Sequence, residues 1–184
     1  LVMAAIRGEA PLPREIVTRA AIENACAVVA ATGGSTNAAL HLPAIAHEAG
    51  IEFDLFDVCD IFRDTPYFVD LKPGGQYVAK DLYEAGGVPV VMKELRKAGL
   101  MHEDCITATG KTIGEELDLI EREADGRVIY PVETPITPTG GVVGLKGNLA
   151  PEGAIVKVAG MSQDEQVFTG PARVFECEED AFEA

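Results

Sequence analysis

The residues best suited to binding an anion lie between positions 33 and 37. They are Gly33, Gly34, Ser35, Thr36 and Asn37. Paired glycines end a helix, and Ser or Thr can cap the next one, so this stretch predicts a turn followed by a helix start. The first N–H groups of a helix have no intrahelical partner and point, like the positive end of the helix dipole, toward an anion such as a carboxylate. These residues alone leave two interpretations open, an anion-binding loop or an ordinary capped corner between two helices.

The segment Thr109-Gly110-Lys111-Thr112 looks like the end of a phosphate-binding loop. That motif requires a glycine five positions before Gly110, and Cys105 occupies the position. The sequence therefore argues against nucleotide binding.

The three histidines lack the spacing of metal ligands. His47-Glu48 is not followed by a second histidine at the position that a zinc protease motif needs. His41 and His47 are six positions apart, so they face different sides of a helix. We expect these two and His102 to be surface or hydrogen-bonded histidines and assign no metal ligand.

The four cysteines are scattered along the chain and form no CxxC pair. They are Cys26, Cys59, Cys105 and Cys177. This spacing favours free thiols in the cytoplasm over a disulfide framework. The pattern does not reveal a role for any of them.

The composition excludes two classes of partner. Thirty acidic and fifteen basic residues in a chain of 184 give a formal charge of −15, which repels the phosphates of nucleic acids. No stretch approaches the ~20 apolar residues that a membrane-spanning helix needs. The chain is long enough for one large domain or two small ones.

Hydrophobic periodicity predicts an α/β chain with a helix-rich first portion. Helices are expected over residues 13–31, 35–50, 55–63, 77–85 and 89–98, with a strand at 67–71. After residue 117 the pattern changes to prolines and glycines and then to short β-like runs, at 142–145, 154–158, 166–168 and 172–175. The acidic run at 176–180 suits the start of a final helix.

Two longer motifs carry a family resemblance. Residues 33–42 read GGSTNAALHL and residues 140–154 read GGVVGLKGNLAPEGA. In this order they resemble the dihydroxy-acid dehydratase and phosphogluconate dehydratase family of iron–sulfur hydro-lyases. The segments DLKPGGQYV (70–78), DLYEAGGVP (81–89) and FTGPARVF (168–175) are similar to the family as well.

The resemblance implies that the chain is the middle of a longer enzyme. Residues 1–118 would be the C-terminal part of an α/β N-terminal domain, 119–140 a linker, and 141–184 the start of a β-barrel-like C-terminal domain. It also favours a substrate-facing role for the loop of Gly33, Gly34, Ser35, Thr36 and Asn37, without naming a catalytic residue in this segment.

The chemistry that the resemblance implies is dehydration of 2,3-dihydroxy-3-methylbutanoate to 3-methyl-2-oxobutanoate, a step of valine and isoleucine biosynthesis, in a homodimer. The cofactors would be an iron–sulfur cluster, [2Fe–2S] rather than [4Fe–4S], and Mg²⁺. Their ligands belong to family motifs outside this segment, because none of the four cysteines lies in a cluster-type context. A sugar-acid dehydratase acting on xylonate, arabinonate or 6-phosphogluconate is the alternative, and a non-catalytic module is a further one.

Overall fold

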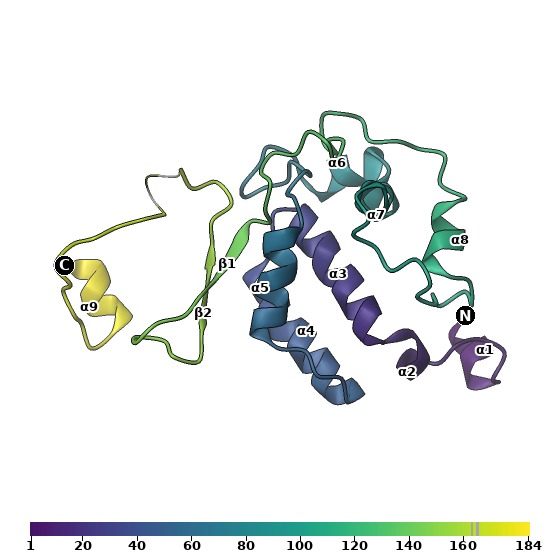
Figure 1. Ribbon diagram of the computed structural model, residues 1–184, viewed down its shortest axis with the longest axis horizontal. Helices are drawn as coiled ribbons and strands as arrows, with labels where there is room; N and C mark the ends of the chain where they lie inside the picture. Colours follow the sequence, from purple (N-terminus) through teal and green to yellow (C-terminus); the bar gives the residue numbers. More distant parts are fainter. Residues whose placement is uncertain (163, 165) are drawn as a thin grey trace.

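The computed structural model describes residues 1–162, 164 and 166–184. It is helix-rich with one small antiparallel sheet, in keeping with the predicted α/β class (Figure 1). The elements, in chain order, are α1 (Val2–Ile6), α2 (Pro13–Ile16), α3 (Arg19–Ala31), α4 (Thr36–Ala49), α5 (Leu55–Asp64), α6 (Ala79–Glu84), α7 (Gly87–Lys97), α8 (Ile113–Leu117), β1 (Val142–Leu145), β2 (Ala154–Lys157) and α9 (Glu178–Glu183).

The single helix predicted over residues 13–31 is wrong, because the chain breaks at Val17 and Thr18 into α2 and α3. Val17 has a ψ of 93° and Thr18 is extended, with its side chain accepting a hydrogen bond from the Ala21 N–H. A threonine in this conformation caps the helix that follows it. The other four predicted helices are confirmed as α4, α5, α6 and α7, with ends shifted by at most two residues.

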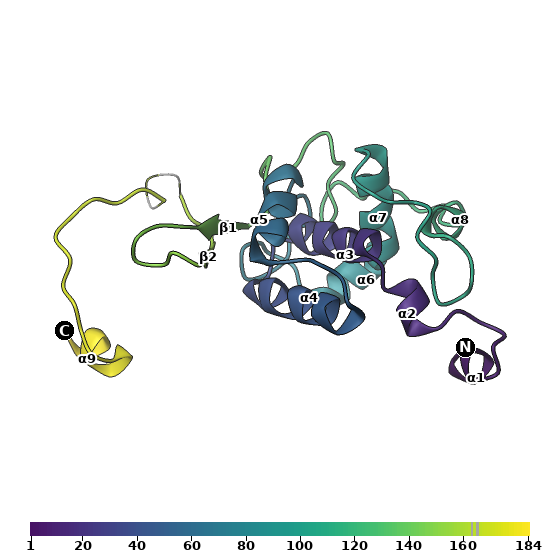
Figure 2. The same cartoon turned by 60° about the horizontal axis from the view of Figure 1, so that its bottom comes forward.

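Helix α3 is central, and it packs against α4, α5 and α7 (Figures 1 and 2). One face of α3 contributes Ala27 and Ala31 to a core with α7 and the segment around Phe68. Its other face contributes Ile22, Cys26 and Ala30 to a core with α4 and α5. The small alanines allow neighbouring helices to approach closely, so the helical body has two apolar cores that share one helix.

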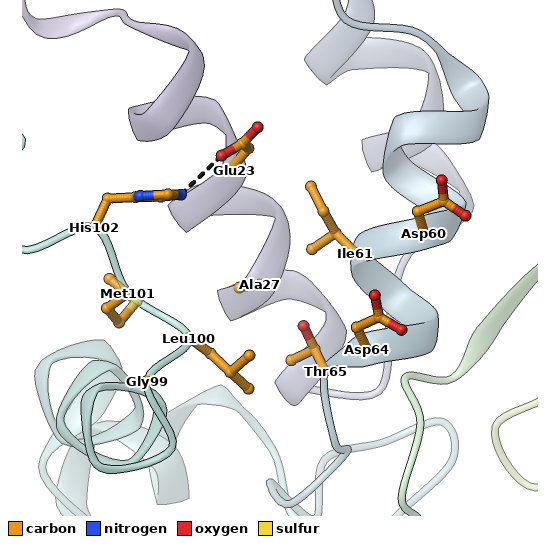
Figure 3. A pocket seen from close by; sticks show the side chains of 10 residues that line it. All are labelled: Glu23, Ala27, Asp60, Ile61, Asp64, Thr65, Gly99, Leu100, Met101 and His102. Atoms are coloured by element: carbon orange, nitrogen blue, oxygen red, sulfur yellow. Dashed lines mark ion pairs between the residues drawn. The ribbon is translucent and has the colours of Figure 1, made fainter.

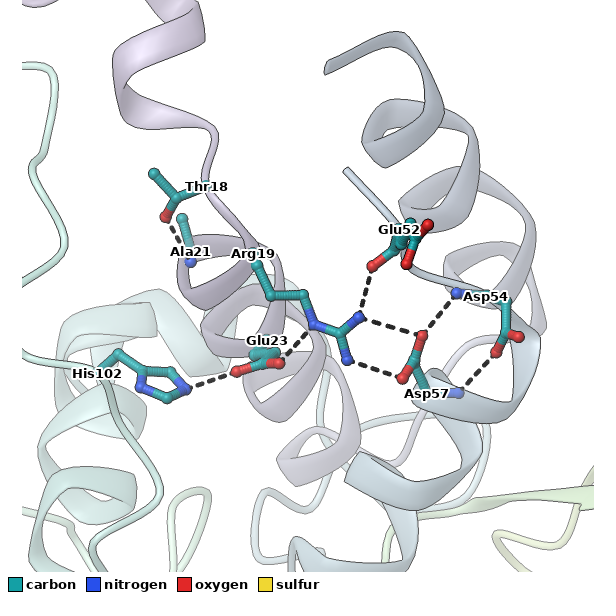
Figure 4. A network of polar contacts seen from close by, with 8 residues as sticks. All are labelled: Thr18, Arg19, Ala21, Glu23, Glu52, Asp54, Asp57 and His102. Atoms are coloured by element: carbon teal, nitrogen blue, oxygen red, sulfur yellow. Dashed lines mark hydrogen bonds and ion pairs between the residues drawn. The ribbon is translucent and has the colours of Figure 1, made fainter. Parts of the chain in front are cut away.

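A polar network on the surface joins α3 to the start of α5 (Figure 4). Arg19 donates to Glu23 at 2.6 Å and to Asp57 at 2.7 Å, and its guanidinium lies 4.9 Å from the centre of the Phe53 ring. Asp54 caps α5 by accepting from the N–H groups of Phe56 and Asp57. The arginine thus holds two helix N-termini together.

The predicted strand at 67–71 is extended but forms only isolated bridges, which pair Tyr67 with Thr137, Val69 with Ile129 and Leu71 with Tyr77. The ladder between β1 and β2 is regular, with Val142 opposite Lys157 and Leu145 opposite Ala154. It is anchored on the helical body, because Val142 is 2% exposed within the core of α3, α4 and α5.

The strands predicted at 166–168 and 172–175 are wrong, since these residues have no regular structure. The expected barrel-like part consists here of two strands, and the sheet is not closed. The physical reason is the lack of a partner strand in the described part of the chain, where Val167, Phe168 and Val174 are 81–89% exposed. The final stretch with α9, which begins within the predicted acidic run, lies apart from the helical body in both views (Figures 1 and 2).

Candidate functional site

The glycine pair Gly33-Gly34 ends α3 with positive φ angles, +94° and +74°. The Gly34 N–H donates to the Val29 carbonyl at 2.9 Å and the Gly33 N–H donates to the Ala30 carbonyl at 3.1 Å. These two bonds form a Schellman motif, which satisfies carbonyls that the helix end would leave free. The predicted turn between two helices is confirmed, and side chains other than glycine would be strained at both positions.

Three glycine pairs from distant parts of the sequence meet beside this turn, namely 33–34, 74–75 and 140–141. A Cβ atom at Gly141 would overlap the Gly33 carbonyl oxygen and lie 2.6 Å from the Ala159 Cβ. A Cβ at Gly34 would lie 2.6 Å from a Val142 methyl, and one at Gly74 would lie 3.2 Å from the Ala159 Cβ. Gly34 and Gly141, one from each long motif, are therefore required because the two motifs pack directly against each other. We call this region the glycine junction.

The polar residues of the loop are free to bind a ligand. Ser35 is the N-cap of α4 but caps no N–H group with its side chain. Thr36 and Asn37 are exposed, and in the described part of the chain none of these three side chains has a hydrogen-bond partner. Since the first N–H groups of α4 also lack intrahelical partners, donors are concentrated at this helix start.

Lys157 adds a cation that the sequence pattern did not single out. Its Nζ donates to the Gly34 carbonyl at 3.0 Å, across 123 positions of sequence. The side chain is half-buried and forms no ion pair with any described residue. Other basic residues of the described chain also lack an ion pair, but Lys157 is held beside the start of α4, where its charge adds to the helix dipole in favouring an anion.

Tyr67 is a second residue near the loop that the sequence analysis did not identify as a candidate site residue. Its side chain is 3% exposed, and its hydroxyl is a buried polar group without a hydrogen-bond partner among the described residues. A Cβ atom added to Gly33 would lie 3.5 Å from the hydroxyl oxygen, and one added to Gly74 would lie 3.6 Å from it. Burial, followed by the nearby Asp70 carboxylate, raises the pKa of Tyr67 and keeps the phenol protonated. The sequence does not predict this buried, unpaired hydroxyl, because its surroundings are formed by residues 33 and 74, which only the fold brings together.

No described histidine or cysteine is among the close contacts of the six glycines in the glycine junction. His41 and His47 are exposed on α4, and His102 forms an ion pair with Glu23 at 2.7 Å. Burial raises the pKa of the Cys26 thiol to about 12 and also raises the pKa values of Cys59 and Cys105, which opposes formation of the thiolates that metals bind. Over the described residues, no three His, Cys, Asp or Glu side chains are grouped to hold a metal ion. These residues do not fit an iron–sulfur cluster or Mg²⁺.

Helices long and apolar enough to cross a bilayer are absent from the described residues.

Comparison with known proteins places this α/β chain in one family of enzymes. Residues 1–116 match the dihydroxy-acid/6-phosphogluconate dehydratase N-terminal domain, and residues 127–184 match the C-terminal domain of the same family. The chain therefore belongs to the dihydroxy-acid/6-phosphogluconate dehydratase family.

Similar proteins include the dihydroxy-acid dehydratase of Dinoroseobacter shibae, which is 81% identical over 93% of this chain and 30% of its own length. The dihydroxy-acid dehydratase 2 of Bradyrhizobium diazoefficiens is 68% identical over 94% of this chain and 30% of its length. The dihydroxy-acid dehydratase of Pelagibacter ubique is 58% identical over 92% of this chain and 29% of its own length. The chain spans about 30% of the length of these relatives.

Proposed function

We propose that the full-length protein is a dihydroxy-acid dehydratase that converts 2,3-dihydroxy-3-methylbutanoate to 3-methyl-2-oxobutanoate in the cytoplasm, as a homodimer. Similarity to three relatives named dihydroxy-acid dehydratase supports this substrate. An iron–sulfur cluster and Mg²⁺ would be held by parts of the protein outside this chain.

In this proposal the chain contributes the end of an α/β domain (1–118), a linker (119–140) and the start of a β-barrel-like domain (141–184). The end of the first matched region at residue 116 supports the first boundary, whereas the second matched region already begins at residue 127, within the proposed linker. The exposed Val167, Phe168 and Val174 support a larger β domain, since further strands would cover them.

The loop formed by Gly33, Gly34, Ser35, Thr36 and Asn37 would bind the carboxylate of the substrate. The observation that carries this role is the unpaired Lys157 ammonium, 3.0 Å from the Gly34 carbonyl at the start of α4. An ammonium, two free hydroxyls and the N-terminus of α4 together favour a carboxylate over any neutral group. The buried Tyr67 hydroxyl behind Gly33 would donate to a substrate oxygen or to a water that bridges to it.

Replacing Lys157 with methionine in the full-length enzyme should raise KM for the branched dihydroxy acid by about tenfold to a hundredfold, with a smaller change in kcat. Loss of one hydrogen bond to a charged group costs about 1.5–3 kcal/mol, which corresponds to this range of change in KM. Steady-state kinetics measures it. Lys146→Met is the matched control, because Lys146 lies on the same hairpin over the Phe56 ring rather than at Gly34.

Lys157→Arg should restore most of the affinity, since it keeps the charge. An unchanged KM in a folded Lys157→Met enzyme would remove Lys157 from the substrate site while leaving the family assignment intact.

The full-length enzyme should also prefer the branched dihydroxy acid to xylonate, arabinonate and 6-phosphogluconate, judged by kcat/KM. A methyl-branched substrate gains from an apolar surrounding, such as the half-buried Ala38 in the first turn of α4. A polyol needs several donors, and a buried polar group left unpaired costs about 1–3 kcal/mol. Higher efficiency on any sugar acid would make the alternative function correct, and inactivity on all four would favour a non-catalytic module.

A further inference from the structure

A pocket unrelated to the glycine junction opens between α3, α5 and the segment that follows α7 (Figure 3). Its volume is about 290 Å³. The walls are largely apolar and come from Ala27 of α3, Ile61 of α5, and Leu100 and Met101. A space of this size takes a small group with a short aliphatic body.

Thr65 provides a polar group inside this pocket. The residue is only 2% exposed, and its hydroxyl makes no hydrogen bond to any residue that the structure describes. The hydroxyl points toward the space between Ala27 and Ile61 (Figure 3). A hydroxyl that faces a largely apolar pocket and has no partner among the described residues is available to a ligand, so a ligand that bonds to it gains a hydrogen bond on binding.

The charges around the pocket favour a cation. Its lining contains the carboxylates of Glu23, Asp60 and Asp64 but no Lys or Arg. Each of these carboxylates already has an ionic partner: Glu23 has two, His102 and Arg19, and the two aspartates share Arg63. A carboxylate offers about four acceptor positions, so capacity remains for another donor.

The apolar walls favour an organic cation over a metal ion. A hydrated metal ion would gain nothing from Ala27, Ile61 and Leu100, and the carboxylates are not grouped as metal ligands in the described chain. An ammonium group on an aliphatic stem matches both the apolar walls and the polar atoms of the pocket. The stem would contact the walls, and the ammonium would donate to oxygen atoms.

We propose that this pocket binds a primary alkylammonium group, with the stem between Ala27, Ile61 and Leu100 and the ammonium donating to the Thr65 hydroxyl and to a carboxylate at the rim. Such a group belongs either to a free small amine or to a lysine side chain from the rest of the longer protein.

The test is a titration of the 184-residue chain and of the full-length protein with n-butylammonium chloride, followed by methyl NMR of Ile61, Thr65, Leu100 and Met101. We expect saturable shifts of these methyl groups, with n-butanol, the neutral counterpart, binding at least tenfold more weakly. Thr65→Val should weaken butylammonium binding about tenfold, as loss of one hydrogen bond to a charged group predicts. Thr65→Ser, which keeps the hydroxyl, should not.

Binding that persists in the full-length protein would identify a free amine as the ligand. Binding by the 184-residue chain that is lost in the full-length protein would show that the longer protein fills the pocket with its own side chain. Equal binding of butanol, unchanged affinity in Thr65→Val, or no saturable shift in either protein would overturn the proposal.

Discussion

Replacing Gly141 with alanine should lower the free energy of unfolding by about 3 kcal/mol. The added Cβ would overlap the Gly33 carbonyl oxygen and lie 2.6 Å from the Ala159 Cβ, and the oxygen belongs to backbone that cannot rotate away. Overpacking a well-packed site costs about 1–3 kcal/mol and occasionally more, and this site includes the end of α3. Urea denaturation followed by circular dichroism measures the difference.

Gly147→Ala is the matched control for Gly141→Ala. Gly147 is exposed in the turn between β1 and β2, and a Cβ there would meet no atom within 4 Å. The unfolding free energy of the Gly147→Ala variant should differ from that of the unchanged protein by no more than about 0.5 kcal/mol. Equal stability of the two variants would show that residues 33 and 141 are not in contact in solution.

Replacing Glu94 with alanine should also cost about 3 kcal/mol, because it removes a fully buried carboxylate that pairs with the partly exposed Lys97. Glu94 is 0% exposed, and its carboxylate accepts from Lys97 Nζ at 2.6 Å and from the Val132 N–H at 3.0 Å. It thereby connects α7 to the proline-rich segment at residues 131–138. Loss of a hydrogen bond to a charged group costs about 1.5–3 kcal/mol, and truncating a fully buried side chain adds the cost of the cavity, whereas Lys97 itself retains Glu123.

Glu84→Ala is the control for this second variant. Glu84 is exposed on α6, 3.6 Å from Lys80, and such surface pairs contribute about 0–1 kcal/mol. Glu94→Gln separates the charge from the hydrogen bond, since glutamine can still accept from the Val132 N–H. Thermal unfolding that ranks Glu94→Ala no lower than Glu84→Ala would contradict the structural role assigned to this carboxylate.

Local signals in the sequence predicted the helices whose ends are determined by neighbouring residues. Helix α4 ends at Gly50, which adopts the left-handed φ of +74° that glycine favours, and α5 begins at Asp54, whose side chain caps it. The break between α2 and α3 was missed because Thr18 fits either a helix interior or an N-cap, and only its extended backbone decides between them. Short apolar runs near the C-terminus resembled strands, but a strand also needs a partner.

Patterns in the sequence were enough to predict the α/β class, most of the helices and the family resemblance, which rests on the two glycine-rich motifs. Only the folded chain shows that these motifs touch, with Gly141 against the Gly33 carbonyl, and that Lys157 donates to the Gly34 carbonyl. It also decided that Tyr67 lies buried with an unpaired hydroxyl and that Thr65 faces a pocket. The physical reason is that caps and turns depend on residues a few positions apart, whereas steric contact, burial and unpaired charge depend on segments brought together only by packing of the two cores around α3.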